Sequence, residues 1–158
     1  RGILVQAPGW RIEGTDPDTP VRMKIGARRP LEPGQIECLT GVVTYDTAEI
    51  DLGVLPAGAI VMGPLLGLDV RVAFDSDGTD RVTVGWTGNT NGVIASAAAL
   101  DLGTQGRKDV LPAHYGSNTG TYNATKRQVK AYYTYSGSAP TAGVARVVIP
   151  YVRVPEAT

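Results

Sequence analysis

The feature that most constrains this chain is a series of short segments in which every second residue is apolar. From about residue 36 onward this alternation recurs, most clearly over 68–74, 82–86 and 129–135. A period of two residues is that of a β-strand with one buried face. Glycine occupies 20 positions and proline 11, a density that suits many short strands joined by turns. The sequence therefore predicts an all-β domain.

The order of the expected strands favours two packed sheets. We expect about eight strands, which fits a β-sandwich, and in particular a jelly-roll-like one, better than a closed barrel. Residues 68–74 and 82–86 flank an aspartate-rich turn and are interpreted as a β-hairpin. The last segment, 144–154, is apolar on both faces, which predicts a central strand or one covered by a neighbouring subunit. Pro150 within it indicates a bulge or an edge.

The first 34 residues differ from the rest of the chain. They contain prolines at positions 8, 17, 20, 30 and 33, which remove backbone donors and push the preceding residues toward extended conformations. We predict an extended N-terminal arm over residues 1–34, with at most one short strand at Val21–Ile25, and a β-sandwich domain over residues 35–158. Such an arm buries little surface alone, so it would be ordered only against its own domain or a neighbour.

The formal net charge is zero, but the charges are unevenly distributed. Residues 1–34 carry +2 (six basic, four acidic), residues 35–101 carry −7 (two basic, nine acidic) and residues 102–158 carry +5 (seven basic, two acidic). These segments either neutralise each other within one sandwich or face each other across subunits. A neutral chain gains little from phosphate contacts, so we expect no nucleic-acid partner. No run of about 18 apolar residues exists, so we expect no membrane span.

Few residues could carry catalysis, and each has a structural explanation. The single histidine, His114, is expected in a surface loop, and no serine elbow accompanies it. The single cysteine, Cys38, is expected to be a small buried hydrophobe. Glu49 and Asp51 would share one face of a strand, where a glycosidase pair and a solvated strand look alike. We predict no enzyme activity.

One acidic segment is the candidate for metal binding. Asp75, Asp77 and Asp80 surround a glycine and resemble half of a calcium loop. Gly78 is out of register with the calcium-loop pattern, and no glutamate follows at the closing position. Aspartate and glycine are also ordinary turn residues. We therefore predict a turn here, and neither a metal nor another cofactor.

Two sets of residues are candidates for contact with a partner. The arm and the second apolar face of the last segment would be covered by a neighbouring molecule. These interface candidates are Trp10, Val21, Met23, Ile25, Val148, Tyr151, Val152 and Val154. If the domain instead binds a carbohydrate, aromatic rings would serve as stacking platforms. The stacking candidates are Trp86, Tyr115, Tyr132 and Tyr135, with ordinary sheet packing as the alternative.

Two stretches of the chain carry a resemblance to known proteins. They are Asp46–Phe74, DTAEIDLGVLPAGAIVMGPLLGLDVRVAF, and Tyr122–Val154, YNATKRQVKAYYTYSGSAPTAGVARVVIPYVRV. A Leu-Pro-Ala-Gly corner, an acidic turn between strands, and a Gly/Thr/Ala turn before a final apolar strand resemble small β-sandwich virion proteins of tailed bacteriophages. The resemblance covers roughly residues 40–154 and does not include the arm.

The resemblance implies a structural role in the virion. It points to a capsid decoration or cement protein, or to a minor head or fibre component, at the capsid surface or at an accessory position on head or tail. The implied partners are other copies of the chain, in a homotrimer, and the major capsid protein, which the arm would grip. The alternative is a carbohydrate-binding β-sandwich of a phage fibre or tail that takes part in host recognition.

Overall fold

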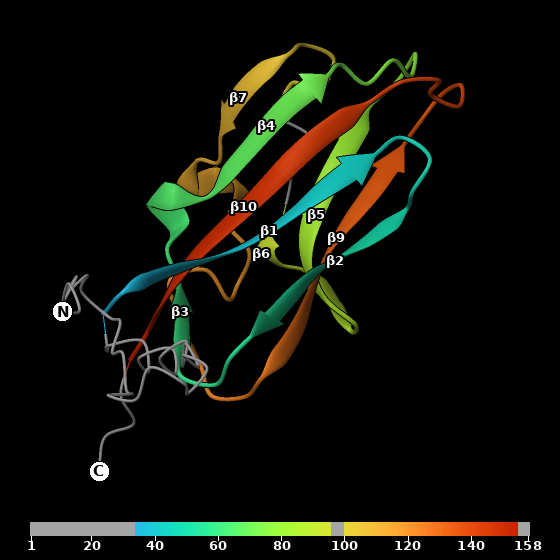
Figure 1. Ribbon diagram of the computed structural model, residues 1–158. Coiled ribbons are helices and arrows are strands. Elements are labelled where there is room, and N and C mark those ends of the chain that lie inside the picture. Colours follow the sequence, from blue (N-terminus) through green and yellow to red (C-terminus); the bar gives the residue numbers. More distant parts are fainter. Residues whose placement is uncertain (1–33, 96–99, 155–158) are drawn as a thin grey trace, which may run out of the picture. The chain divides into compact units, whose positions relative to one another are not determined.

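The computed structural model describes residues 34–95 and 100–154, and these ranges are almost entirely β-structure (Figure 1). The strands are β1 (Ile36–Thr44), β2 (Glu49–Leu55), β3 (Ala59–Val61), β4 (Gly67–Val72), β5 (Asp80–Trp86), β6 (Asn89–Ile94), β7 (Gly106–Asp109), β8 (Tyr122–Asn123), β9 (Arg127–Tyr135) and β10 (Val144–Arg153). Two short 3-10 helices, η1 (Gly63–Leu65) and η2 (Pro112–His114), connect some of them. In the described ranges no helix is long and apolar enough to cross a bilayer. The all-β prediction is confirmed.

The strands form two antiparallel sheets with nested pairing. One sheet contains β7, β4, β10, β3 and β8, with β1 on the other side of β10, and the second has the order β2-β9-β5-β6. β1 pairs with β10, β2 with β9, β4 with β7 and β5 with β6, each pair antiparallel. The chain is thus one long hairpin rolled into two sheets, with β4 beside β10 and β5 beside β9. This is the jelly-roll arrangement, as predicted.

Strand β10 is central, as its two apolar faces predicted. β1 covers one edge along its whole length, while β4 pairs with Val144–Val148 and β3 with Tyr151–Arg153 on the other edge. Pro150 lies where the second edge passes from β4 to β3, and its carbonyl accepts from the Met62 N–H at 2.8 Å. Proline has no N–H, and an N–H at this position would point to the place where the edge passes from β4 to β3. Pro150 therefore interrupts no hydrogen bond of the sheet. Pro150 therefore marks a change of partner rather than an edge.

The core lies between the inner faces of the two sheets. From the first sheet Val43, Leu68 and Val147 are buried, and from the second Val84 and Val129. Along β9 buried residues alternate with less buried ones, because side chains on a strand point to opposite faces in turn, while in β1 only Leu39 and Val43 are buried. The two walls of the core are thus built from the inward-facing residues of both sheets.

The predicted hairpin between residues 68–74 and 82–86 is wrong. β4 belongs to the six-stranded sheet and β5 to the four-stranded sheet, and the intervening segment passes from one to the other. Phe74, in that segment, is buried against Tyr133 of β9 with ring centroids 4.8 Å apart. Two strands that bury apolar residues in one core show the same alternation whether they pair or face each other.

Three further expectations about single side chains are wrong. Cys38 is exposed, because its position in β1 points to the outer face of the sheet. His114 is buried rather than on the surface, and its Nδ1 accepts from the Leu111 N–H at 3.1 Å. Val72 was expected on the buried face with Leu68, but it is 40% exposed because the pairing of β4 with β10 shifts register between Val144 and Ala145.

Candidate functional site

The outer face of the six-stranded sheet carries a continuous row of apolar side chains. Ile36 of β1 lies opposite Val152 of β10, Val152 opposite Ile60 of β3, and Ile60 opposite Tyr122 of β8. Ile36 is 56% exposed and Tyr122 47%, while the two central members are half-buried. These four residues, called the apolar row below, cross the sheet at the end where β1 begins and β10 ends (Figure 1).

The other end of the same face is charged. Val42 of β1 lies opposite Arg146 of β10, Arg146 opposite Asp69 of β4, and Asp69 opposite Arg107 of β7. The Arg71 guanidinium contacts the Asp69 carboxylate at 2.6 Å. One sheet face is therefore apolar at one end and charged at the other, so a molecule docking on it would be both bound and oriented.

The outer face of the four-stranded sheet is polar and engages its own neighbours. The Lys130 ammonium pairs with the Glu49 carboxylate, and the Gln128 amide donates to the Asp51 carboxylate. These contacts, with the ion pair between Arg153 and Glu37, join the acidic segment 35–101 to the basic segment 102–158 within one chain. Part of the charge difference between the two segments is thus neutralised by ion pairs within one chain. The contrast between the two outer faces makes the six-stranded sheet the candidate assembly surface.

The interface candidates from the sequence divide into three groups. Val152 belongs to the apolar row, Val148 lies on the same face opposite Thr40, and Val154 follows as a 40% exposed residue. Tyr151 is buried in the core, where its hydroxyl donates to the Glu37 carboxylate at 2.5 Å. The remaining four, Trp10, Val21, Met23 and Ile25, lie outside the described residues.

Three members of the apolar row were not among the sequence candidates. Ile36, Ile60 and Tyr122 come from three strands that are far apart in the sequence. Each is an apolar residue next to a residue of the buried face, so the alternation alone places it on the outside. Only the register of four strands shows that these outward residues meet in one row.

The four stacking candidates lie in separate environments. Trp86 is buried, and the Arg127 guanidinium lies 4.9 Å from its ring centroid. Tyr115 is half-buried against Gly63, and Tyr132 is half-buried on the outer face of the four-stranded sheet. Tyr135 is 47% exposed and stacks on Tyr133 with ring centroids 6.0 Å apart. They do not form a single platform.

The aspartates of the predicted turn act as hydrogen-bond acceptors. Asp75 accepts from the Thr141 N–H at 2.7 Å, the Thr141 hydroxyl at 2.6 Å and the Ala142 N–H at 2.9 Å. Asp77 accepts from the Ser138 N–H. Asp80 accepts from the Ser76 hydroxyl at 2.9 Å and from the Tyr133 hydroxyl. In the described ranges no three His, Cys, Asp or Glu side chains are grouped to hold a metal ion.

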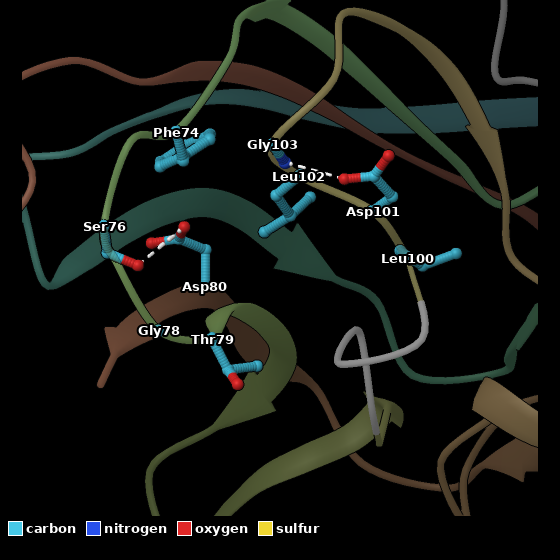
Figure 2. Close-up of a pocket in the computed structure, with 9 residues that line it drawn as sticks. All are labelled: Phe74, Ser76, Gly78, Thr79, Asp80, Leu100, Asp101, Leu102 and Gly103. Atoms are coloured by element: carbon cyan, nitrogen blue, oxygen red, sulfur yellow. Dashed lines mark hydrogen bonds between the residues drawn. The ribbon is translucent and has the colours of Figure 1, made fainter. Parts of the chain in front are cut away.

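A polar cavity of about 380 Å³ lies beside these residues, and Figure 2 shows the side chains that line it. Its two carboxylates belong to Asp80 and Asp101. Asp101 accepts from the Gly103 N–H at 3.0 Å and the Thr104 hydroxyl at 2.6 Å. These bonds lower the pKa of Asp101, with the Thr104 hydroxyl as the main cause. Both carboxylates therefore hold local structure, and the lowered pKa of Asp101 is the opposite of what a general acid needs.

Comparison with known proteins gives a shared fold. No protein-family model matches the chain, and no curated protein matches its sequence. A chain from the cyanophage Pam1 capsid asymmetric unit is similar in structure, with 19% identity, a TM-score of 0.56, and 88% of this chain aligned to 100% of that one. The acid-stable capsid structure of Helicobacter pylori bacteriophage KHP30 gives 17% identity, a TM-score of 0.50, and 78% aligned to 96%. The jelly roll of this chain therefore also occurs in chains from two phage capsid structures.

Proposed function

We propose that this chain is a non-enzymatic structural protein of a bacteriophage virion, which associates with copies of itself and decorates or stabilises the capsid. The observation that carries the proposal is the alignment of 88% of this chain with the whole of a chain from a phage capsid asymmetric unit. Because all of that chain is matched, it is itself about the size of this jelly roll. A small accessory component of a capsid shell would have about this chain length.

The apolar row gives such a protein a surface for assembly. Isolated exposed apolar residues are normal on protein surfaces. A row of them across four strands instead exposes a connected apolar surface to water, and this unfavourable exposure ends only when a partner covers the row. The charged end of the same face would set the orientation of the partner. We place contacts between copies, in a homotrimer, at this face. A cement protein stabilises a shell because opening the shell must then break such contacts.

The N-terminal arm is the proposed contact with the major capsid protein. This part of the proposal rests on the sequence, where five prolines and the apolar residues Trp10, Val21, Met23 and Ile25 favour an extended segment that needs another surface. An arm folded on binding spreads contacts over a large area of the shell. The two contacts are separable, because one belongs to the sheet and the other to the arm.

The test uses capsids of the phage that encodes this chain, prepared so that they lack the chain. The full-length chain should co-sediment with these capsids at a fixed stoichiometry. A truncation without residues 1–34 should keep its thermal unfolding transition and lose capsid binding. If the truncated domain decorates capsids normally, the role of the arm is wrong. If virions contain no copies of the chain, the proposed function is wrong.

A further inference from the structure

A pocket lies at the end of the sandwich opposite the apolar row. It is formed where the turn between β1 and β2 meets the turn between β9 and β10, at the upper right of Figure 1. The two turns are joined by a hydrogen bond from the Tyr45 N–H to the Gly143 carbonyl, at 3.0 Å. The pocket has a volume of about 350 Å³ and is lined by Tyr45, Asp46, Tyr133, Tyr135, Ala139 and Pro140. We call it the tyrosine pocket.

The aromatic wall of this pocket is supported from inside the domain. Phe74 in the core contacts Tyr133, and Tyr133 stacks on Tyr135 with an angle of 30° between the ring planes. Tyr133 is fixed in turn, because its hydroxyl donates to the Asp80 carboxylate. Tyr135, the last ring of the series, is 47% exposed, and Tyr45 is 37% exposed. Tyr135 therefore projects from the end of β9 and Tyr45 from the turn after β1, and both rings offer an apolar face without further ordering.

The opposite wall is held by hydrogen bonds and by the burial of Pro140, while Ala139 is exposed. The turn that carries Ala139 and Pro140 donates three hydrogen bonds to the Asp75 carboxylate and one to the Asp77 carboxylate, from residues 138, 141 and 142. The Ser136 N–H also donates to the Thr79 carbonyl at 3.0 Å. A turn of glycine, serine and alanine fixed at several points keeps the shape of a pocket between ligand-free and ligand-bound states.

The chemistry of the lining selects a class of ligand. The apolar groups are two exposed tyrosine rings with alanine and proline, and the polar groups are the tyrosine hydroxyls and the Asp46 carboxylate. Hydrogen bonding, chiefly to the Thr44 side chain, lowers the pKa of Asp46, so this group is an ionised acceptor at neutral pH. Among the described residues none that lines the pocket is Lys, Arg or His, so these residues offer no counter-charge to a phosphate or an acidic sugar.

We propose that the tyrosine pocket binds a neutral saccharide, with a sugar ring stacked on Tyr135 and a sugar hydroxyl donating to Asp46. A pyranose has an apolar face of C–H groups and a rim of hydroxyls, which are the two features that this lining matches. The site does not depend on the proposed assembly function, because it lies at the other end of the strands from the apolar row.

The test is saturation-transfer NMR on the full-length chain with neutral oligosaccharides of glucose, galactose, mannose and N-acetylglucosamine. Sialyllactose serves as an acidic probe and choline as a cationic one. At least one neutral oligosaccharide should receive saturation. Tyr135→Ala should weaken its binding about tenfold, because one stacking contact is lost. Tyr135→Phe keeps the ring and should bind more tightly than Tyr135→Ala.

The matched control is Tyr132→Ala, which removes a tyrosine from the other face of the same strand. This variant should bind as the unchanged chain does. The proposal is overturned if no neutral oligosaccharide receives saturation, if Tyr132→Ala and Tyr135→Ala weaken binding equally, or if only choline or sialyllactose binds. Capsid binding by Tyr135→Ala should be normal, so failure here and failure of the assembly function can be told apart.

Discussion

Ile36 and Val152 lie directly opposite each other on the outer face of the six-stranded sheet, where β1 begins and β10 ends. Ile60 and Tyr122 continue this pair across β3 and β8. Val42, on the same strand and face as Ile36, lies opposite Arg146 instead. The two ends of β1 therefore present different chemistry to a neighbour, and this difference allows the assembly surface to be tested within one strand.

Gly143 should not accept a side chain. Its φ is 150°, and an added Cβ would overlap the ring of Phe74, which is buried at the crossing between the sheets. Gly143→Ala should lower the free energy of unfolding by about 3 kcal/mol, through overpacking and backbone strain together. Gly120, with φ of 75° and open space around it, is the control, since Gly120→Ala should cost only about 1 kcal/mol. Urea denaturation measures both, and equal effects would contradict the assigned packing.

Asp75 should stabilise the fold in a pH-dependent way. Its bonds from the Thr141 hydroxyl and from the Ala142 and Thr141 N–H groups lower its pKa below the usual 3.8. A carboxyl whose pKa is lowered in the folded state stabilises it above the unfolded pKa, and this contribution is lost as the pH falls through the folded pKa. Asp75→Asn should therefore lower the melting temperature at neutral pH and flatten its decline below about pH 4.

The control for that experiment is Asp109→Asn, because Asp109 is exposed and its only ion pair in the described ranges is a 3.6 Å contact with Arg107. An exposed pair of this kind contributes little to stability. If Asp109→Asn and Asp75→Asn shift the melting temperature equally at neutral pH, the bonds of Asp75 to the β9–β10 turn do not stabilise the fold.

Tyr151 should produce the opposite pH dependence. Burial, and then its hydrogen bond to Glu37, raise the pKa of Tyr151 from 10 to about 12. A raised pKa means that the folded state keeps a proton that the unfolded state loses, so stability falls as the pH rises from about 10 to about 12. Urea denaturation at several alkaline pH values should show this fall. Tyr151→Phe should reduce its steepness, and Tyr133 and Lys130, whose pKa values are also raised, contribute to the remainder. An unchanged slope would contradict the buried hydrogen bond.

The strands could be predicted from the sequence because a period of two residues is a local property. Val129 and Ala131 are buried and alternate with less buried neighbours along β9, and the nested order of such strands fits a jelly roll. The central position of β10 followed in the same way from its apolar residues on both faces. Properties that depend on one strand at a time could thus be predicted from the sequence.

Properties that depend on strand register or on contacts between distant parts of the chain could not be predicted from the sequence. The hairpin expected across residues 75–79 is a crossing between sheets, and no local pattern separates the two cases. The apolar row joins residues from four strands, and the tyrosine pocket joins Tyr45, in the turn after β1, to Tyr135, at the end of β9. His114 is buried because η2 folds its ring back onto the Leu111 N–H, a contact that composition does not reveal.

The most direct test of the assembly surface is native mass spectrometry of the full-length chain beside two lysine variants. Ile36→Lys places a charge in the apolar row, and Val42→Lys places one at a position of similar exposure, 50% against 56%, on the same strand and face. We predict a homotrimer for the unchanged chain, and a smaller loss of association for Val42→Lys than for Ile36→Lys. Ile36→Lys should weaken association at least tenfold, because the burial of one large aliphatic side chain is lost. A monomeric unchanged chain, or equal effects of the two variants, would contradict the account.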